Sequence, residues 1–203
     1  MNKTDPIFKQ ILKADWDNLG KVIQDHYYLK PYSNDYICVT GEMDEIYHSS
    51  IAKLLIPFAL IFGAIVPFND SNVPIEVHYN SNLDNSKLMW DRVFKFKTHK
   101  AFHFKSYMEQ QSGNEVIEYV RFGVGMKLAV SVQNGAIIFH DKGYVWKIMG
   151  IKIPLPINLL FGHAYIEERP IDETHFSMKM IIKHPLFGIL FRYSGQFTFI
   201  QNK

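Results

Sequence analysis

Most of the chain from residue 73 onward consists of short segments in which apolar and polar side chains alternate. In "PIEVHY", for example, Ile75, Val77 and Tyr79 occupy every second position. A period of two predicts β-strands with one face toward a core. Short strands joined by tight turns are typical of an antiparallel meander. Turn-forming residues separate the segments at 80–85, 111–114, 134–135, 141–143 and 170–173.

The number of predicted strands constrains the fold further. Residues 35–47 also have the character of a strand, so the chain holds roughly ten strands, and an open twisted sheet of that size curls or closes. The sequence therefore predicts an α+β protein that is mainly β. We expect a large curled antiparallel sheet or partly open barrel, packed against short apolar helices near the N-terminus. The pattern does not decide whether the sheet closes.

Three segments have the composition to cover the concave face of such a sheet. Residues 5–29 carry apolar side chains at steps of three and four, which predicts a helix with one buried stripe and a break near Gly20. Residues 51–66 predict a second, apolar helix, and residues 185–192 form a short apolar stretch. No linker, internal repeat or low-complexity tract interrupts the sequence, so we expect one domain over residues 1–203.

The run "IAKLLIPFALIFGAIVPF" at 51–68 resembles a membrane segment by hydropathy. Only about fifteen residues after Lys53 are free of charged and hydrogen-bonding side chains, whereas a spanning helix needs ~20. Pro57 and Pro67 kink or stop a helix, and Ser49 or Ser50 can cap its start. We expect a short helix in the core, with a membrane interface or a true span as the alternatives.

Composition narrows the class of protein. Of 203 residues, 47 % are hydrophobic and 15 % aromatic, which is ample for a packed core. The net charge of +2 gives no global attraction to nucleic acid. Cys38 is the single cysteine, which excludes an intramolecular disulfide and suits a reducing compartment. Charged residues interrupt any apolar run in the first 24 residues, so we expect a cytoplasmic protein, with a peripheral contact to the inner membrane face as an option.

The second half combines several motifs in a particular order: "VPIEVHY", "WDRVF", "RFGVGMKLAV", "GIKIPLP" and "HPLFGILFRYSGQF". Over roughly residues 5–199, the chain resembles the bacterial domain-of-unknown-function 4166 family. The resemblance implies that 51–66 is a short apolar stretch rather than a membrane anchor. Relatives occur alone or behind nucleotide-binding, reductase-like domains. They tend to carry an acidic residue where this chain has Val120, and the nearest acid here is Glu118. The biochemical function of the family is open, so the resemblance supplies no reaction.

Arg92 is the most informative single residue, because the rest of its strand face is Trp90, Phe94 and Phe96. A buried arginine is costly unless it is paired or faces a ligand. One interpretation is an internal ion pair, for instance with Glu118. The other is a cation at the mouth of an apolar cavity, where it would hold the carboxylate or phosphate of an amphipathic ligand. A position on the convex face is the third.

The candidate ligand-binding residues combine this strand with the methionines and arginines of other predicted strands. Arg121 and Arg192 are weaker candidates, since an arginine at the end of a strand also extends its head into water. The full set is Trp90, Arg92, Phe94, Phe96, Arg121, Met178, Met180, Arg192 and Tyr193.

Motifs of known catalytic or metal chemistry are absent from the sequence. Nine histidines occur, but none falls in a zinc pattern such as HExxH. No GxSxG, phosphate-binding loop or dinucleotide fingerprint is present. We therefore expect no catalytic residue, metal or cofactor. The lysine row Lys95, Lys97 and Lys100 has its aromatic neighbours on the opposite face, which argues against nucleic acid and leaves attraction to anionic lipid headgroups.

Three function classes stay open. The first is a binding module for a lipid-like or acyl ligand inside the curled sheet, because such cavities are mostly apolar with a few polar groups. The second is a structural or partner-docking domain with a fully packed core. The third is an accessory enzyme of lipid or acyl metabolism, although we expect no enzyme. The partners expected are a small hydrophobic or amphipathic ligand and an anionic membrane surface, and the oligomeric state is not determined.

Overall fold

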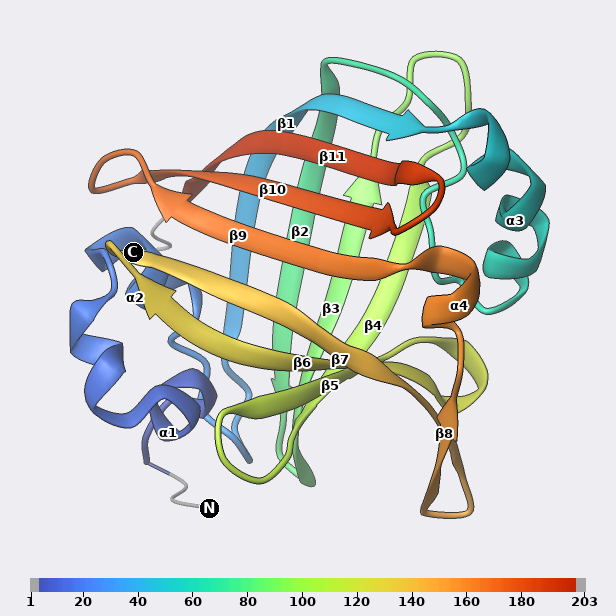
Figure 1. Ribbon diagram of the computed structural model, residues 1–203. Helices are drawn as coiled ribbons and strands as arrows, with labels where there is room; N and C mark the ends of the chain where they lie inside the picture. The colour runs from blue at the N-terminus through green and yellow to red at the C-terminus, as the bar shows by residue number, and fades with distance from the viewer. Residues whose placement is uncertain (1–3, 200–203) are drawn as a thin grey trace.

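In a computed structural model that describes residues 4–199, eleven strands form one antiparallel sheet (Figure 1). Ten of these strands close into a barrel, because β6 pairs with β7 as well as with β5. The eleventh, β8, pairs with β7 alone and extends it as a hairpin. The strands are β1 (Tyr36–His48), β2 (Val73–Asn82), β3 (Asn85–Phe94), β4 (Phe102–Gln110), β5 (Glu115–Tyr119), β6 (Val124–Gln133), β7 (Ala136–Ile148), β8 (Ile151–Leu155), β9 (His163–Pro170), β10 (His175–His184) and β11 (Gly188–Phe199).

The predicted fold class is confirmed, and the structure shows that the sheet closes. Strand β1, expected at 35–47, is the element that joins the two edges of the meander. It pairs with β2 on one side and with β11, at the other end of the chain, on the other. Closure removes the free edges that a sheet of this size would otherwise expose.

The N-terminal segment folds into three short helices rather than one. They are α1 (Ile7–Leu12), the 3-10 helix η1 (Lys13–Asn18) and α2 (Lys21–His26). The predicted break near Gly20 is present, since Leu19 and Gly20 have extended backbone angles. The backbone N–H of Gly20 donates to the carbonyl of Gly135 at 2.9 Å. This bond holds the segment against the β6–β7 turn. Phe8 and Ile23, from its buried side, are fully inaccessible to solvent.

The apolar helix α3 (Ser50–Ile61) is shorter than the predicted 51–66. Ser49 caps its start by accepting a hydrogen bond from the N–H of Ala52 at 3.1 Å. The helix ends before Gly63, whose φ of +64° has left the helical region. Among residues 4–199, no helix is long and apolar enough to cross a membrane. Only one side of the helix lies in the core: Ala52 and Ala59 are buried, whereas the large side chains of Leu54, Phe58 and Ile61 are exposed.

Residues 185–192 were expected to cover the sheet, and that prediction is wrong. They form the β10–β11 turn and the start of β11, within the barrel wall. Leu190 and Phe191 are buried there because helix α3 and the neighbouring strands pack on them. The apolar composition of this stretch therefore reflects a covered strand rather than a separate plug.

Because the strands are antiparallel, the connections between them alternate between the two ends of the barrel. Helices α1, η1 and α2 lie at one end, together with the β6–β7 turn (Figure 1). The opposite end, called the α3 end below, carries α3, the 3-10 helix η2 (Arg121–Gly123), the β7–β8 hairpin, helix α4 (Asn158–Phe161) and the β10–β11 turn. The interior between the two ends holds the main hydrophobic cluster.

Candidate functional site

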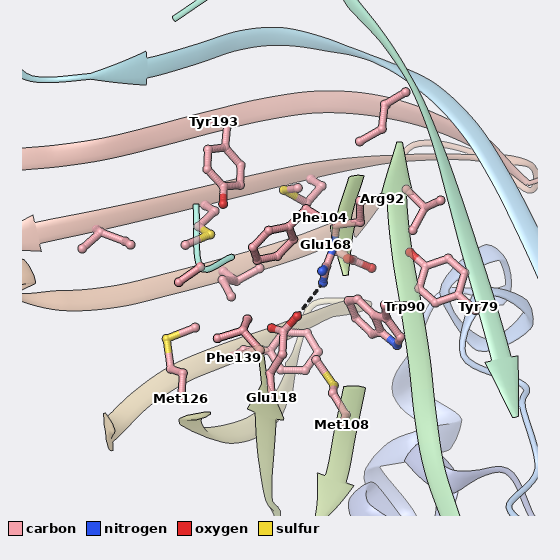
Figure 2. Close-up of a pocket in the computed structure, with 18 of the residues that line it drawn as sticks. Tyr79, Trp90, Arg92, Phe104, Met108, Glu118, Met126, Phe139, Glu168 and Tyr193 are labelled. Carbon is pink, nitrogen blue, oxygen red and sulfur yellow. Dashed lines mark hydrogen bonds and ion pairs between the residues drawn. The ribbon is translucent and has the colours of Figure 1, made fainter. Parts of the chain in front are cut away.

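A cavity of about 140 Å³ lies inside the barrel. Figure 2 shows that its walls come from strands on several sides of the barrel. Alternation along each strand places every second side chain in the interior, so the lining is mainly aromatic, aliphatic and methionine. The large apolar residues of the lining include Trp90, Phe94, Phe104, Met108, Met126, Phe139, Phe176, Met178, Met180 and Phe197.

Arg92 brings a positive charge into this apolar lining from β3. Its guanidinium carbon lies 4.3 Å from the ring centre of Trp90 and 5.0 Å from that of Phe104. Two aromatic rings therefore flank the cation and replace part of its hydration. Arg92 occupies the same face of β3 as Trp90 and Phe94, as the period of two predicted.

Glu118 on β5 neutralises Arg92 through a three-membered network with Ser106 on β4. Arg92 Nη2 donates to Glu118 Oε1 at 2.9 Å, and the Ser106 hydroxyl donates to the same oxygen at 2.6 Å. Arg92 Nη1 donates to the Ser106 hydroxyl oxygen at 3.1 Å. Burial is the largest single influence and lowers the pKa of Arg92, but the charge of Glu118, the hydrogen bond to it and the nearby Tyr79 and Tyr193 together raise that pKa on balance. Of the interpretations drawn from the sequence, the structure shows the internal ion pair (Figure 2).

A second carboxylate, Glu168 on β9, also lines the cavity and is buried. Its Oε2 lies 3.2 Å from Nδ1 of His26, the last residue of α2. Among the described residues, neither this oxygen nor the two imidazole nitrogens has a hydrogen-bond partner. The His26 ring stacks on Phe176 with the ring centres 4.7 Å apart. Glu168 thus contacts His26 without a well-aligned hydrogen bond, and burial together with the charge of Glu168 raises the pKa of Tyr27.

Tyrosine hydroxyls supply the remaining polar groups of the cavity, from Tyr27, Tyr79, Tyr144 and Tyr193. Burial raises the pKa of Tyr193 to about 12, and it raises the pKa of Tyr79 well above the ordinary value. These hydroxyls therefore stay neutral near pH 7 and can both donate and accept. Figure 2 shows the Tyr193 hydroxyl directed into the cavity.

The cavity extends from the N-terminal helices to the α3 end. Tyr27, which follows α2, lines it on one side. Ala64, Val120 and Val124 line it on the other, and these residues flank α3 and η2. The backbone N–H of Arg121 donates to the carbonyl of Phe62 at 3.0 Å, which ties the two segments together. The segment that follows α3 and contains Ala64 thus forms part of the cavity wall at the α3 end.

The structure brings six of the nine predicted site residues together in the cavity lining: Trp90, Arg92, Phe94, Met178, Met180 and Tyr193. Three lie elsewhere. Phe96 packs against Phe68 with the ring centres 5.1 Å apart, Arg121 is exposed in η2, and Arg192 faces outward from β11. Arg192 pairs there with Glu45, with Nη2 2.7 Å from Oε1.

Three members of the internal polar group, Glu168, His26 and Tyr27, were not predicted from the sequence. The signal for Glu168 was present, because Ala164, Ile166 and Glu168 share one face of β9 by the period of two. Its contact with His26 joins a strand to a helix about 140 residues away in sequence, which no local pattern reveals. No group of three or more His, Cys, Asp or Glu side chains with the geometry of a metal site occurs in residues 4–199.

Comparisons with known proteins place the chain in a family. No curated protein sequence matches it. Among solved structures, the crystal structure of Rv2717c from M. tuberculosis aligns with 90 % of this chain and 99 % of that chain, at 12 % sequence identity and a TM-score of 0.46. The family model described as domain of unknown function (DUF4166) matches residues 19–197, nearly the whole chain. By that match, the chain belongs to the DUF4166 family.

Proposed function

We propose that this barrel is a binding module that holds a hydrophobic ligand with one uncharged polar group in its interior cavity. The observation that supports it is the charged network of Arg92, Glu118 and Ser106 beside a mostly apolar cavity. A buried ion pair contributes little net stability compared with well-packed apolar residues. Concave apolar sites with a few polar groups are typical of small-molecule binding.

The charge balance of the cavity favours a neutral polar group over an anionic one. The sequence suggested Arg92 as an anchor for a carboxylate or phosphate, but Glu118 already neutralises it. Glu168 adds a further acidic side chain to the lining. An anionic headgroup would meet this acidic side chain in a medium of low dielectric. A hydroxyl or amide can instead use the tyrosine hydroxyls, the remaining donors of Arg92 and the Glu168 oxygen that lacks a well-aligned hydrogen bond.

The size of the cavity limits the first ligands to test. At about 140 Å³, it is close to the ~150 Å³ engineered cavity that takes up benzene. Four methionines line it, and their flexible, polarizable side chains repack readily. A lipid-like or acyl chain therefore requires the methionines to change rotamer or the segment around Ala64 to move. The small volume is also what favours the second candidate, a barrel whose core is closed to ligands and serves a structural or docking role.

Fluorescence of Trp90 provides a direct test, because this residue lines the cavity. In a Trp16→Phe/Trp146→Phe variant it is the only tryptophan. We expect benzyl alcohol and decanol to change its emission in a saturable manner, and decanol to bind more tightly than decanoate of the same chain length. Mass spectrometry of the denatured protein would identify any co-purified ligand.

A matched pair of variants separates the cavity from the surface. Val77→Phe adds volume beside Arg92, its register partner on β3, and should abolish the titration. Met89→Phe creates the same side chain on the exposed face of β3 and should leave binding intact. If no probe binds and no ligand co-purifies, the closed barrel with a structural role is the better account. Tighter binding of decanoate than of decanol would contradict the charge argument.

A further inference from the structure

Most of the large apolar side chains that the barrel exposes lie at its α3 end. On α3 itself, Leu54 is 76 % exposed and Phe58 is 69 % exposed. Large apolar surfaces of this kind on a folded protein mark a site of interaction. The set comprises Ile51, Leu54, Phe58 and Ile61 of α3, Phe122 of η2, Trp146, Ile148, Met149, Ile151 and Ile153 of the β7–β8 hairpin, Leu159 and Leu160 of α4, and Leu186 and Phe187 of the β10–β11 turn.

The outward direction of the α3 side chains follows from the packing of its inner face. Ala52 and Ala59 contact the barrel, and such small residues let the helix lie close to the wall. Leu54, Phe58 and Ile61 follow at three- and four-residue steps on the side that the barrel does not cover. Apart from Lys53, the helix is therefore apolar on both sides, although residues 4–199 cover only one of them.

Contacts between the connections show that these residues belong to one end of the molecule. The rings of Phe62 and Phe122 meet edge to face with their centres 6.2 Å apart. Trp146 Nε1 donates to the carbonyl of Phe122 at 2.8 Å, which joins the hairpin to η2. His184 Nε2 lies 3.1 Å from the carbonyl oxygen of Leu159, which joins α4 to the β10–β11 turn. Figure 1 shows these elements grouped opposite α1 and α2.

The charged residues that the surface segments themselves supply are all basic, and one of them, Lys147, pairs with Glu109 of β4 at 2.7 Å. Lys53, Arg121 and Lys183 are exposed and form no ion pair with any residue in 4–199. Segments 49–69, 120–123, 146–162 and 181–187, which supply the surface, contain no aspartate or glutamate. The β3–β4 connection adds Lys97 and Lys100, and its His99 stacks on Phe68 at 3.8 Å. Basic residues interspersed with leucine, phenylalanine and tryptophan are typical of surfaces that enter the lipid interface.

We propose that the α3 end is a docking surface for membranes that contain anionic phospholipids. Leu54, Phe58 and the neighbouring apolar residues enter the headgroup region, while the lysines and Arg121 contact lipid phosphates. Docking at this end also bears on the proposed binding function, and this part of the proposal rests on that function. Because Ala64, Val120 and Val124 line the cavity at this end, docking would bring the cavity next to the bilayer.

Vesicle co-sedimentation tests the docking. We expect the full chain to bind vesicles of phosphatidylcholine mixed with roughly one-third phosphatidylglycerol more tightly than vesicles of phosphatidylcholine alone, and added salt to weaken the difference. Leu54→Ser/Phe58→Ser should reduce the bound fraction by more than about tenfold. Trp146, which is 39 % exposed at this end, should shift its emission to the blue on binding.

The opposite end of the barrel supplies a matched control. Leu83 and Ile171 are exposed large apolar residues at the β2–β3 and β9–β10 connections. Leu83→Ser/Ile171→Ser should bind vesicles as the unmodified protein does. Equal losses in both double variants, or no binding of the unmodified protein to either vesicle, would overturn the proposal. A dimer that dissociates on Leu54→Ser/Phe58→Ser, without vesicle binding, would assign the surface to a second copy of the chain instead.

The two proposals fail separately. Val77→Phe fills the cavity and leaves the α3 end unchanged, so it should abolish the decanol titration and retain vesicle binding. Leu54→Ser/Phe58→Ser should retain binding of benzyl alcohol in solution and lose vesicle binding. Loss of both properties in both variants, with the fold intact by circular dichroism, would contradict the separation of the two sites.

Discussion

Nη2 of Arg92 lies 2.9 Å from Oε1 of Glu118 inside the barrel, on strands separated by β4. The side chains are only 14 % and 8 % exposed. Removal of one partner leaves the other as an unpaired charge in an apolar cavity. We expect Arg92→Leu or Glu118→Leu alone to lower the free energy of unfolding by roughly 3–5 kcal/mol. The double variant should recover most of this loss, as measured by urea denaturation.

The exposed pair of Arg192 and Glu45 is the control for this prediction. Its side chains are 37 % and 40 % exposed, so water screens the interaction. Arg192→Leu should cost at most about 1 kcal/mol. If Arg92→Leu and Arg192→Leu have equal effects, the interior pair does not carry the burial penalty that its position implies.

Burial of the cavity tyrosines predicts a loss of stability at alkaline pH. The pKa of Tyr193 is raised to about 12 in the folded protein, against about 10 for an exposed tyrosine. Below pH ~10 the tyrosine keeps its proton in both the folded and the unfolded state, so its full contribution to the free energy of unfolding is present. Between pH 10 and 12 the unfolded state loses the proton first, and up to roughly 3 kcal/mol is lost. The free energy of unfolding of Tyr193→Phe should therefore decline less steeply over this window.

Ultraviolet absorbance of the phenolate checks the same point independently. A solvent-exposed tyrosine ionises at pH ~10 without unfolding of the protein. The cavity tyrosines should ionise only together with the loss of circular dichroism. Complete titration near pH 10 in a protein that stays folded would show that the cavity is open to water.

His48, the last residue of β1, predicts a loss of stability on acidification. Burial lowers the pKa of His48 to about 4, a hydrogen bond with the backbone of Val66 opposes this effect, and nearby Lys53 adds to it. Above pH 6.5 the imidazole is neutral in both states. Between pH 6.5 and 4 the unfolded state takes up the proton first, so stability falls by up to roughly 3 kcal/mol.

The difference in free energy of unfolding between the unmodified protein and His48→Gln separates the effect of the His48 imidazole from that of the carboxylates that titrate in the same pH range. We expect the difference in free energy of unfolding to shift in favour of the variant as the pH falls from 7 to 5. Hydrogen exchange of residues 62–69 should report it locally, because the side chain of Asn69 bonds the backbone of His48 at 3.0 and 3.2 Å. A constant difference across this pH range would exclude the effect.

A substitution at Gly162, between α4 and β9, tests how closely the backbone segments pack at the α3 end. The φ of this glycine is +79°, and a Cβ at this position would collide with the carbonyl oxygen of Lys183. Gly162→Ala should cost at least about 2 kcal/mol in thermal or urea unfolding. Gly113→Ala is the control, since Gly113 also has a positive φ, +66°, but no heavy atom beyond its chain neighbours lies within 4 Å of where its Cβ would be. Its cost should be about 1 kcal/mol, and equal costs would mean that the backbone angle alone is responsible.

Local sequence patterns predicted which side chains face the barrel interior wherever apolar and polar residues alternate regularly. Trp90, Arg92 and Phe94 were assigned to one face of a strand, and all three line the cavity. Phe96 has the same parity but lies beyond the end of β3, where the regular alternation no longer positions a side chain. Arg192 was a weaker candidate from the sequence, and the period of two that places Tyr193 inside directs Arg192 outward.

Other features depended on contacts between distant segments. Glu118 was named as a partner of Arg92, but Ser106 became part of the network only through the register of β3 and β4. The contact between Glu168 and His26 requires that α2 insert beside β9. The same holds for α3, whose apolar composition could not reveal which side the barrel covers.

The sequence by itself determined that this chain is mainly β, that its strands follow one another antiparallel, and which residues of the most regular strands, such as β2 and β3, face inward, because a period of two is a local property of the backbone. Tertiary structure decided the rest. Closure depends on β1 pairing with β11, about 150 residues away. The cavity depends on which inward side chains meet across the barrel, and the exposed apolar α3 end depends on what the barrel leaves uncovered.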